Sequence, residues 1–293
     1  MATFTTADIP RLTGSTVIVT GASSGIGLAT ARGLAAAAAR VVFAVRNTEK
    51  GKAAAAATPG DTEVRELDLA SLDSVRAFAG GWDGPIDLLI NNAGVSTPSL
   101  TRTVDGFESK FGTNHLGHFA LTNLLLEHVT GRVVTVASQA ERYGRLDFDD
   151  LNWEHRAYQP SRAYNDSKLA NLLFTAELQR RLTAAGSGVL ANAAHPGLVA
   201  TNIYHHDGPR RPADLLWAVA TRLLAQDADH GALPVLYAAV AGIPGNSFAG
   251  PSHLAHMRGA PELIGRSTAA QDPELARRLW AVSEQLTGVG SPL

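Results

Sequence analysis

The stretch Thr20-Gly21-Ala22-Ser23-Ser24-Gly25-Ile26-Gly27 lies between a β-branched run, Thr16-Val17-Ile18-Val19, and an alanine-rich segment over 28–35. The first run predicts a buried strand and the later segment predicts a helix. Glycines at a strand-to-helix turn permit positive φ, and the free N–H groups of a helix N-terminus attract an anion. The context therefore predicts a phosphate-binding turn with the spacing G-x-x-x-G-x-G. The alternative is a turn that needs glycines only for its backbone path.

The composition is that of an ordinary globular protein. The 293 residues are 45% hydrophobic and 18% charged, with a net charge of −2 and no cysteine. This length suits one α/β domain over 1–293, and the charge favours neither nucleic acid nor an anionic membrane surface. The lack of cysteine excludes disulfides, thiolate metal sites and cysteine nucleophiles. The segment 1–14 has no signal-peptide pattern and no apolar run reaches about 20 residues, so we expect a cytoplasmic protein without a membrane segment.

Strand-like and helix-like segments alternate along the chain. Strands are predicted at 16–19, 41–45, 63–67, 86–90, 133–136, 188–193 and 247–249. Helices are predicted at 28–35, 48–57, 71–79, 106–128, 163–185, 211–226 and 272–286. The alternation predicts a single Rossmann-type, doubly wound α/β domain with a mainly parallel sheet of about seven strands and helices on both faces. Ligands bind at the carboxyl ends of such strands, which is where the remaining motifs lie.

A tyrosine and a lysine share one face of a predicted helix. Tyr164 and Lys168 are four residues apart, and a nearby ammonium lowers the pKa of a phenol towards neutral pH. An exposed helix pair is the alternative. Ser138 ends the fifth predicted strand, where its hydroxyl could bond a substrate carbonyl or merely cap the strand end. Asn114 lies in the predicted helix 106–128, where asparagine is unfavourable, which indicates a helix-distorting or water-binding role.

Together these residues resemble the short-chain dehydrogenase/reductase family. The resemblance covers nearly the whole chain and rests on the following elements: the turn at 20–27, Asp68, Asn91-Asn92-Ala93-Gly94, Asn114, Ser138, Tyr164 with Lys168, and Pro196-Gly197 with Thr201. It narrows to the retinol-dehydrogenase-like branch because 26 positions separate Ser138 from Tyr164, whereas the plainest members have about a dozen. The same branch is indicated by Asp147-Phe148-Asp149-Asp150-Leu151-Asn152, by Ser167-Lys168-Leu169-Ala170-Asn171, by His195-Pro196-Gly197 and by 276–284.

The resemblance implies a mechanism and a set of site residues. Tyr164 would be the general acid/base, Lys168 would lower its pKa and hold the nicotinamide ribose, and Ser138 would orient the carbonyl or alcohol. Asn114 would position a water that links Lys168 to solvent. Hydride would pass between the cofactor and the substrate carbon. The implied cofactor-binding residues are Gly21, Ser23, Ser24, Gly25, Ile26, Gly27, Asp68, Leu69, Asn92, Ala93, Gly94, Tyr164, Lys168, Pro196, Gly197, Val199 and Thr201.

The end of the second predicted strand bears on the choice of cofactor. An acid there bonds the 2′-hydroxyl of NAD, whereas an arginine suits the 2′-phosphate of NADP. The sequence reads Val45-Arg46-Asn47, with no acid before Glu49. Arg46 and Asn47 therefore predict NADP(H) as the cofactor, the alternative being a solvated loop arginine.

Three variable pieces, 139–162, 202–217 and 246–258, are predicted to select the substrate. Their aromatic residues favour a hydrophobic or aromatic carbonyl, and we expect 202–217 to act as a mobile lid. The expectation rests on the following residues, which we expect to be exposed: Tyr143, Trp153, Tyr158, Tyr204, Leu215, Leu216 and Phe248. The pairs His205-His206 and His253 with His256 lack an evident carboxylate set, so we expect pocket-rim or solvent histidines and no metal.

The sequence thus favours an NADP(H)-dependent carbonyl reductase or alcohol dehydrogenase. Its partner would be a small carbonyl or alcohol, and a homodimer or homotetramer is compatible with the chain. An NADP-binding regulator without turnover is the alternative, but such proteins usually lose the tyrosine or lysine that this chain keeps as Tyr164 and Lys168. Enoyl reductases of the family commonly place six residues between the two, whereas here three intervene.

Overall fold

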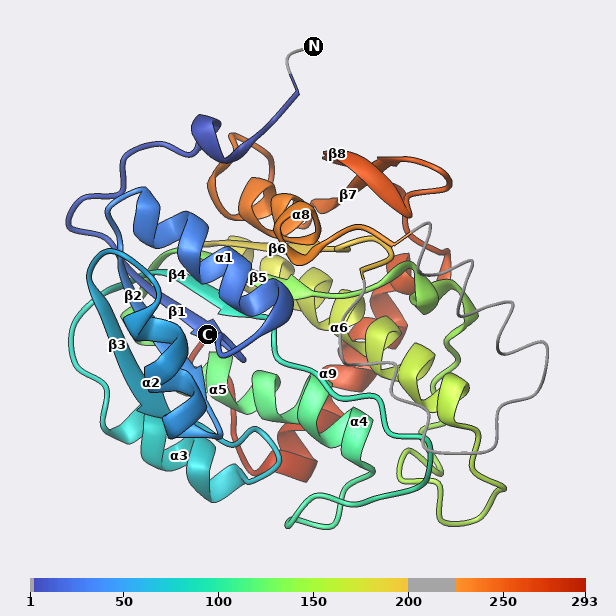
Figure 1. The fold of residues 1–293 in the computed structure, drawn as a ribbon. Helices are drawn as coiled ribbons and strands as arrows, with labels where there is room; N and C mark the ends of the chain where they lie inside the picture. Colours follow the sequence, from blue (N-terminus) through green and yellow to red (C-terminus); the bar gives the residue numbers. More distant parts are fainter. Residues whose placement is uncertain (1–2, 200–224) are drawn as a thin grey trace.

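A single eight-stranded sheet forms the centre of the computed structural model, which describes residues 3–199 and 225–293 (Figure 1). The strands are β1 (Thr16–Thr20), β2 (Arg40–Val45), β3 (Thr62–Glu66), β4 (Ile86–Asn91), β5 (Val129–Val136), β6 (Leu190–Ala194), β7 (Phe248–His253) and β8 (Arg258–Leu263). Their order is β3-β2-β1-β4-β5-β6-β7-β8, and all pairs are parallel except β7 with β8. The predicted doubly wound fold is confirmed, with its topological switch between β1 and β4.

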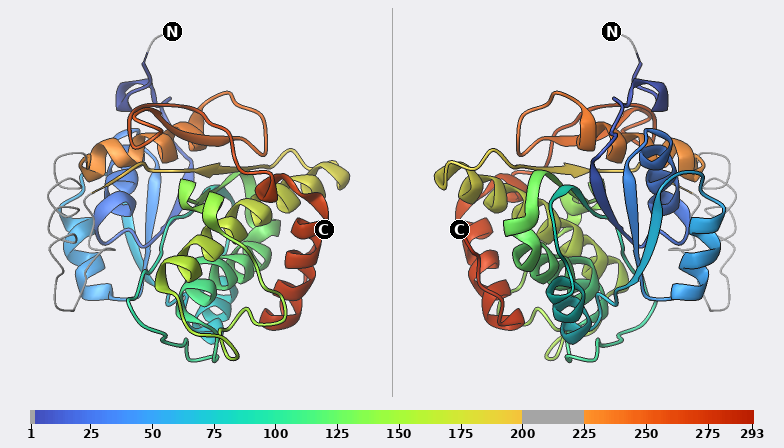
Figure 2. Two further views of the ribbon diagram at one scale, coloured as in Figure 1. Left: turned by 90° about the vertical axis from the view of Figure 1, so that its right-hand side faces the viewer. Right: turned by 90° about the vertical axis from the view of Figure 1, so that its left-hand side faces the viewer.

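Helices cover both faces of the sheet (Figure 2). One face carries α1 (Gly25–Ala36), α2 (Thr48–Ala56) and α8 (Ala228–Val240). The other carries α3 (Leu72–Gly80), α5 (Gly117–Leu125), α6 (Pro160–Ala184) and α9 (Pro273–Thr287). The alternation of side chains along a strand explains the two cores. Val17 packs with Leu34 and Leu236 on the first face, whereas Ile18 joins the cluster of Phe119 and Trp280 on the second.

The register of the parallel strands brings their carboxyl ends to one edge. Thr20 of β1 lies beside Ala44 of β2, Asn91 of β4 beside Thr135, and Val136 of β5 beside Ala194. The residues that follow each strand therefore emerge side by side, as the sequence predicted for this type of sheet.

The predicted helix over 106–128 is wrong as a continuous α-helix. The structure has a short α4 (Ser109–Phe111), a π-helical segment (Gly112–Leu116), α5, and a 3-10 turn (Leu126–His128). Asn114 lies at the centre of the π segment, where its side chain bonds the backbone of Val95. Single π turns inside helices are typical of functional sites, so the predicted distortion at Asn114 is present in this form.

Two elements of the C-terminal third were not predicted. Helix α8 contains Pro234, which reads as a helix breaker, yet the helix continues through it. Strand β8 contains Gly259 and Pro261 and ends in the exposed residues Glu262 and Leu263. It is an edge strand, where proline is tolerated. The strand predicted at 247–249 corresponds to the start of β7, and most of the variable piece 246–258 is β7 and its turn into β8. The predicted helix 211–226 lies almost wholly outside the described residues.

Candidate active site

A cleft of about 800 Å³ opens at the carboxyl ends of the strands. It is lined by residues that follow each of the first six strands: Gly21 after β1, Arg46 after β2, Asp68 after β3, Asn92 after β4, Ser138 after β5 and Pro196 after β6. Every predicted cofactor-binding residue among those described borders this cleft. Thr201 lies outside the described residues.

The glycine-rich turn forms a cradle with no room for side chains. Gly21 and Gly25 have φ of +69° and +55°, a region that L side chains rarely adopt. A Cβ on Gly27 would lie 2.4 Å from Asn92 Nδ2 and 2.5 Å from Gly21 O. Ser24, at the N-cap of α1, makes no side-chain capping bond to the helix. The first N–H groups of α1 therefore face the cleft without a capping side chain, which suits a bound phosphate.

The hydroxyl of Thr20 joins the cradle to the loop after β4. Its Oγ1 accepts hydrogen bonds from the backbone N–H groups of Asn92 and Ala93, both at 2.9 Å, and lies 2.9 Å from His118 Nε2. Asn92 Nδ2 donates to Thr20 O at 2.8 Å. These buried bonds fix the distance between the glycine-rich turn and the 92–94 loop, so the two walls of the cleft are preset.

The end of the cleft beyond β2 is cationic. Arg46, Asn47 and Lys50 all line it. Asn47 Oδ1 accepts from Lys50 N at 2.9 Å and so caps α2, which leaves Arg46 and Lys50 as the charged groups facing an anion there. Lys50 was not predicted. Asn47 as an N-cap could have indicated it, because the third residue after an N-cap lies in the first turn of the helix, next to the strand end.

A third wall of the cleft follows β3. Asp68 Oδ1 accepts from Ala70 N at 2.9 Å, which orients the carboxylate in its turn. Leu69 is buried beneath it, and a Cβ on Gly117 would lie 2.4 Å from Leu69 O. Gly117 thus lets α5 approach this turn closely. The packing holds the Asp68 carboxylate and the Leu69 side chain in the wall of the cleft.

Tyr164 and Lys168 border the same cleft from α6. Lys168 Nζ lies 5.5 Å from the centre of the Tyr164 ring and donates to Val136 O at 3.1 Å. Burial lowers the pKa of Lys168 to about 8. The ammonium form still prevails at neutral pH, so a positive charge stands beside the phenol and favours its ionised form.

The wall formed by the loop after β4, at Val95, is held by an asparagine that does not line the cleft. Asn114 is fully buried; its Oδ1 accepts from Val95 N at 2.8 Å, and its Nδ2 donates to Val95 O at 3.2 Å and to Ser167 Oγ at 3.0 Å. A Cβ on Gly94 would lie 3.3 Å from Asn114 Oδ1 and 3.8 Å from Lys168 Nζ. The side chain of Asn114 is therefore engaged with protein groups, and its water-holding role stays a prediction.

Ser138 and His195 occupy the ends of β5 and β6. Ser138 lines the cleft and accepts from Ala140 N at 3.2 Å, which leaves its hydroxyl proton for another acceptor. His195 also lines the cleft, and burial lowers its pKa to about 3, so the ring is neutral. Its Nδ1 is buried and has no hydrogen-bond partner among the described residues. The sequence singled out His195 without assigning it a role.

Two of the three predicted substrate pieces do not line the cleft. In the described part of the chain, no residue of 139–162 or 246–258 borders the cleft. The third piece, 202–217, lies outside the described residues, together with the expected lid, Tyr204 and the histidine pair at 205–206. Trp153 and Phe248 were expected to be exposed but are buried, because they pack against Tyr158 and within the sheet core respectively. His253 ends β7 and His256 lies in the turn that follows; neither lines the cleft, although the backbone of His256 bonds the lining residue His195.

Residues 3–199 and 225–293 contain neither a candidate metal site nor a helix that could span a membrane. No group of three or more histidines and carboxylates has the arrangement of a metal site. No helix in those ranges has the length and apolar character needed to cross a membrane.

Comparison with known proteins agrees with this geometry. The family model of the short chain dehydrogenases matches residues 15–211. The chain belongs to the short-chain dehydrogenase family. Retinol dehydrogenase 13 of Homo sapiens is 43% identical over 302 residues, which cover 95% of this chain and 86% of that protein. Retinol dehydrogenase 12 of Homo sapiens is 41% identical, with 95% and 88% covered. These relatives place the chain in the retinol-dehydrogenase-like branch.

Solved structures of similar chains have the same fold. An uncharacterized protein from Mycobacterium Paratuberculosis is 53% identical and covers 100% of both chains, with a TM-score of 0.88. The RhlG/NADP active-site complex of Pseudomonas aeruginosa is 25% identical over 81% of this chain and 94% of that chain, with a TM-score of 0.65. As a member of this family, the short-chain dehydrogenase described here is an oxidoreductase of alcohols and carbonyls that uses a nicotinamide cofactor.

Proposed function

We propose that this enzyme uses NADP(H) to interconvert a hydrophobic alcohol and its carbonyl compound. The observation that carries the chemistry is the pairing of Tyr164 with the buried ammonium of Lys168 in a cleft that also holds the glycine-rich cradle. Arg46 and Lys50 at the far end of the cleft support the choice of NADP(H), because two cations suit a phosphate better than a ribose hydroxyl.

The residues of the cleft fit such a cofactor. The cradle at Gly21, Gly25 and Gly27 would hold the pyrophosphate against the N-terminus of α1, and Asp68 would accept from the adenine amino group. Pro196, Gly197 and Val199, after β6, would hold the carboxamide. When bound, the nicotinamide supplies or accepts the hydride.

The proton steps belong to the chain's own side chains. In reduction, Tyr164 would donate its proton to the carbonyl oxygen; in oxidation, its phenolate would accept the proton of the alcohol. Lys168 would stabilise that phenolate and hold the ribose, while the Ser138 hydroxyl would donate to the substrate oxygen. Asn114 would act through Val95 by fixing the wall that faces Tyr164.

The test is turnover on a panel of carbonyl compounds with each cofactor. We expect oxidation of NADPH at 340 nm, on the order of a hundredfold more efficient than that of NADH, with apolar and aromatic aldehydes or ketones. Retinal belongs in the panel because the relatives above are retinol dehydrogenases. Efficient use of NADH would contradict the cofactor assignment, and tight NADPH binding without turnover on any compound would favour the regulator.

A further inference from the structure

The wall of the cleft next to the Tyr164–Lys168 pair is a short loop segment, Val95-Ser96-Thr97. It directly follows Gly94, whose backbone passes close to Lys168 Nζ. The segment therefore borders the same part of the cleft as Tyr164, where a substrate would be held. The 139–162 insert, by contrast, lines no part of the cleft. Any influence of the insert on the substrate has to pass through other residues.

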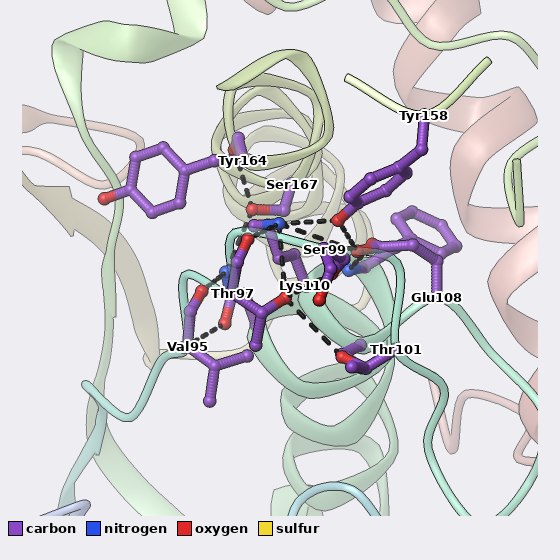
Figure 3. A network of polar contacts seen from close by, with 12 residues as sticks. Val95, Thr97, Ser99, Thr101, Glu108, Lys110, Tyr158, Tyr164 and Ser167 are labelled. Carbon is purple, nitrogen blue, oxygen red and sulfur yellow. Dashed lines mark hydrogen bonds and ion pairs between the residues drawn. The ribbon is translucent and has the colours of Figure 1, made fainter. Parts of the chain in front are cut away.

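A buried lysine connects the wall to the insert (Figure 3). The side chain of Lys110, in α4, is 0% exposed, and its Nζ donates to Thr97 O at 2.7 Å and to Tyr158 Oη at 2.6 Å. The Lys110 ammonium also lies 4.9 Å from the centre of the Tyr158 ring. One ammonium thus bonds a backbone carbonyl of the wall and a side chain of the insert.

A buried glutamate completes this arrangement. Tyr158 Oη donates to Glu108 Oε1 at 2.7 Å, and Glu108 Oε2 accepts from Phe111 N at 2.8 Å. Burial, reinforced by Glu108, raises the pKa of Tyr158, so its hydroxyl keeps the proton that it donates. The hydroxyl therefore bridges two buried charges of opposite sign. Removal of such a bridge is costly, because both charges lose a partner in a site that water does not reach.

The same wall is bonded from its other side to the helix that carries Tyr164. Asn114 holds both backbone groups of Val95 and also donates to Ser167 Oγ. Ser167 Oγ in turn donates to Tyr164 O at 2.8 Å. In Figure 3 these bonds form a nearly continuous path from Tyr158 through Lys110 and the wall to the backbone of Tyr164.

We infer that Lys110, Glu108 and Tyr158 are positioning residues, which set the shape of the 95–97 wall and thereby the fit of the alcohol or carbonyl substrate. The insert acts on the substrate through the Tyr158 hydroxyl and not by contact. This network adds a determinant of substrate fit to the proposed function, and its kinetic part, the expected effect on KM, rests on that function. Its structural part, the positioning of the wall, does not.

The first experiment measures the wall directly in the protein without cofactor. In Tyr158→Phe, the backbone amide of Val95 should exchange with solvent about tenfold faster than in the wild type, because Lys110, which bonds Thr97 O of the wall, loses the hydroxyl that holds its ammonium in place. Lys110→Met should show the same effect, at least as large. The matched control is Tyr143→Phe, since Tyr143 belongs to the same insert, is 78% exposed and has no part in this path. Unchanged exchange at Val95 in both network variants would overturn the inference.

The second experiment separates substrate from cofactor. For the best carbonyl compound of the panel, Tyr158→Phe should raise KM about tenfold while the Kd for NADPH stays within about twofold. Tyr143→Phe should leave both unchanged. A Kd raised as much as KM would show general loss of structure and overturn the positioning role, as would an unchanged KM. If the wild type turned over no compound, the proposed function would fail, and the exchange of Val95 would still decide whether the wall is positioned in this way.

Discussion

The two ends of the cleft are built by different means. At the phosphate end, the walls are backbone: Gly21, Gly25 and Gly27 remove side chains so that the chain and the N-terminus of α1 can approach a ligand. At the reacting end, the walls are held by buried side chains, among them Asn114 and Lys110, which bond backbone groups of the 95–97 segment. The glycines of the first end lie close together in the sequence, whereas the side chains of the second end act through bonds across 13 to 53 positions.

The two ends should therefore be sensitive to different kinds of substitution. A backbone cradle is damaged by any added atom, whatever its chemistry, because there is no space for it. A side-chain network is damaged by loss of a polar partner, whatever its size, because the remaining groups are buried. Substitutions at the two ends should therefore have separable effects on turnover, cofactor affinity and stability.

The largest effect should come from the reacting end and spare the phosphate end. Tyr164→Phe removes the acid/base group, so kcat should fall by about three orders of magnitude or more, while the Kd for NADPH stays within about threefold. Steady-state kinetics and a fluorescence titration measure the two. Tyr143→Phe, an exposed tyrosine outside the cleft, is the control. Substantial activity in Tyr164→Phe would show that another group carries the proton.

At the phosphate end, one methyl group should be enough to cause damage. Gly27→Ala places a Cβ 2.5 Å from Gly21 O, so we expect the free energy of unfolding to fall by about 2–3 kcal/mol and NADPH affinity to fall with it. Gly80→Ala is the matched control, since a Cβ there meets nothing within 4 Å and the residue ends a helix. Chemical denaturation measures stability. Equal stability of the two variants would mean that the cradle yields more easily than its packing indicates.

The buried histidines behind the reacting end should make the protein sensitive to acid. Burial lowers the pKa of His115 to about 3 and that of His118 to about 4, below the ordinary value of 6.5. The folded state keeps both rings neutral, whereas the unfolded chain binds protons below pH 6.5. Stability is therefore full above pH 6.5 and declines as the pH falls towards the folded pKa, by about 2 kcal/mol per ring at pH 5.

Substitution of one of these rings tests the origin of that decline. His115 lies among Phe111, Phe119 and Phe174, and Ser283 Oγ, which bonds its Nε2, also donates to Leu279 O. His115→Phe should therefore reduce the loss of stability between pH 7 and pH 5 by about 2 kcal/mol, whatever the bond to Ser283 contributes to stability at pH 7. Denaturation at both pH values measures it, with substitution of the exposed His155 by glutamine as the control. An unchanged pH dependence in His115→Phe would assign the acid sensitivity to other groups.

The smallest effect should come from the exposed cations at the phosphate end. Arg46→Asp should raise the Kd for NADPH at least tenfold, about 1.4 kcal/mol, because it removes a charge-assisted contact and adds repulsion. Lys50→Ala should raise it less, since only the second cation is lost and the cap by Asn47 remains. Titration of NADPH and NADH measures both. The Kd for NADH should change little, and equal NADPH affinity in Arg46→Asp and the wild type would contradict the assigned 2′-phosphate contact.

The contrast between the two ends also explains which parts of the site could be predicted. The cradle, the cation after β2 and the Tyr164–Lys168 pair were predicted because each is a local pattern: a turn, a strand end, or two positions four apart on a helix. Lys110 and Glu108 were not, because nothing in their neighbourhood of the sequence distinguishes them from a solvated helix start. The 139–162 insert was expected to select the substrate, but only its fold against α4 decides that Tyr158 bonds Lys110 and Glu108 behind the wall, with Asn152 on the backbone of Glu108.

The doubly wound sheet and the residues at its carboxyl edge followed from the sequence alone. Strand and helix periodicity and glycine turns are local consequences of side-chain chemistry, so they can be recognised without the structure. The tertiary structure alone decided the π turn at Asn114, the burial of Lys110 with Glu108, and the neutral states of His115 and His118. The physical reason is that burial and hydrogen bonding between distant segments depend on how the elements pack, and no local pattern records which side chains water will no longer reach.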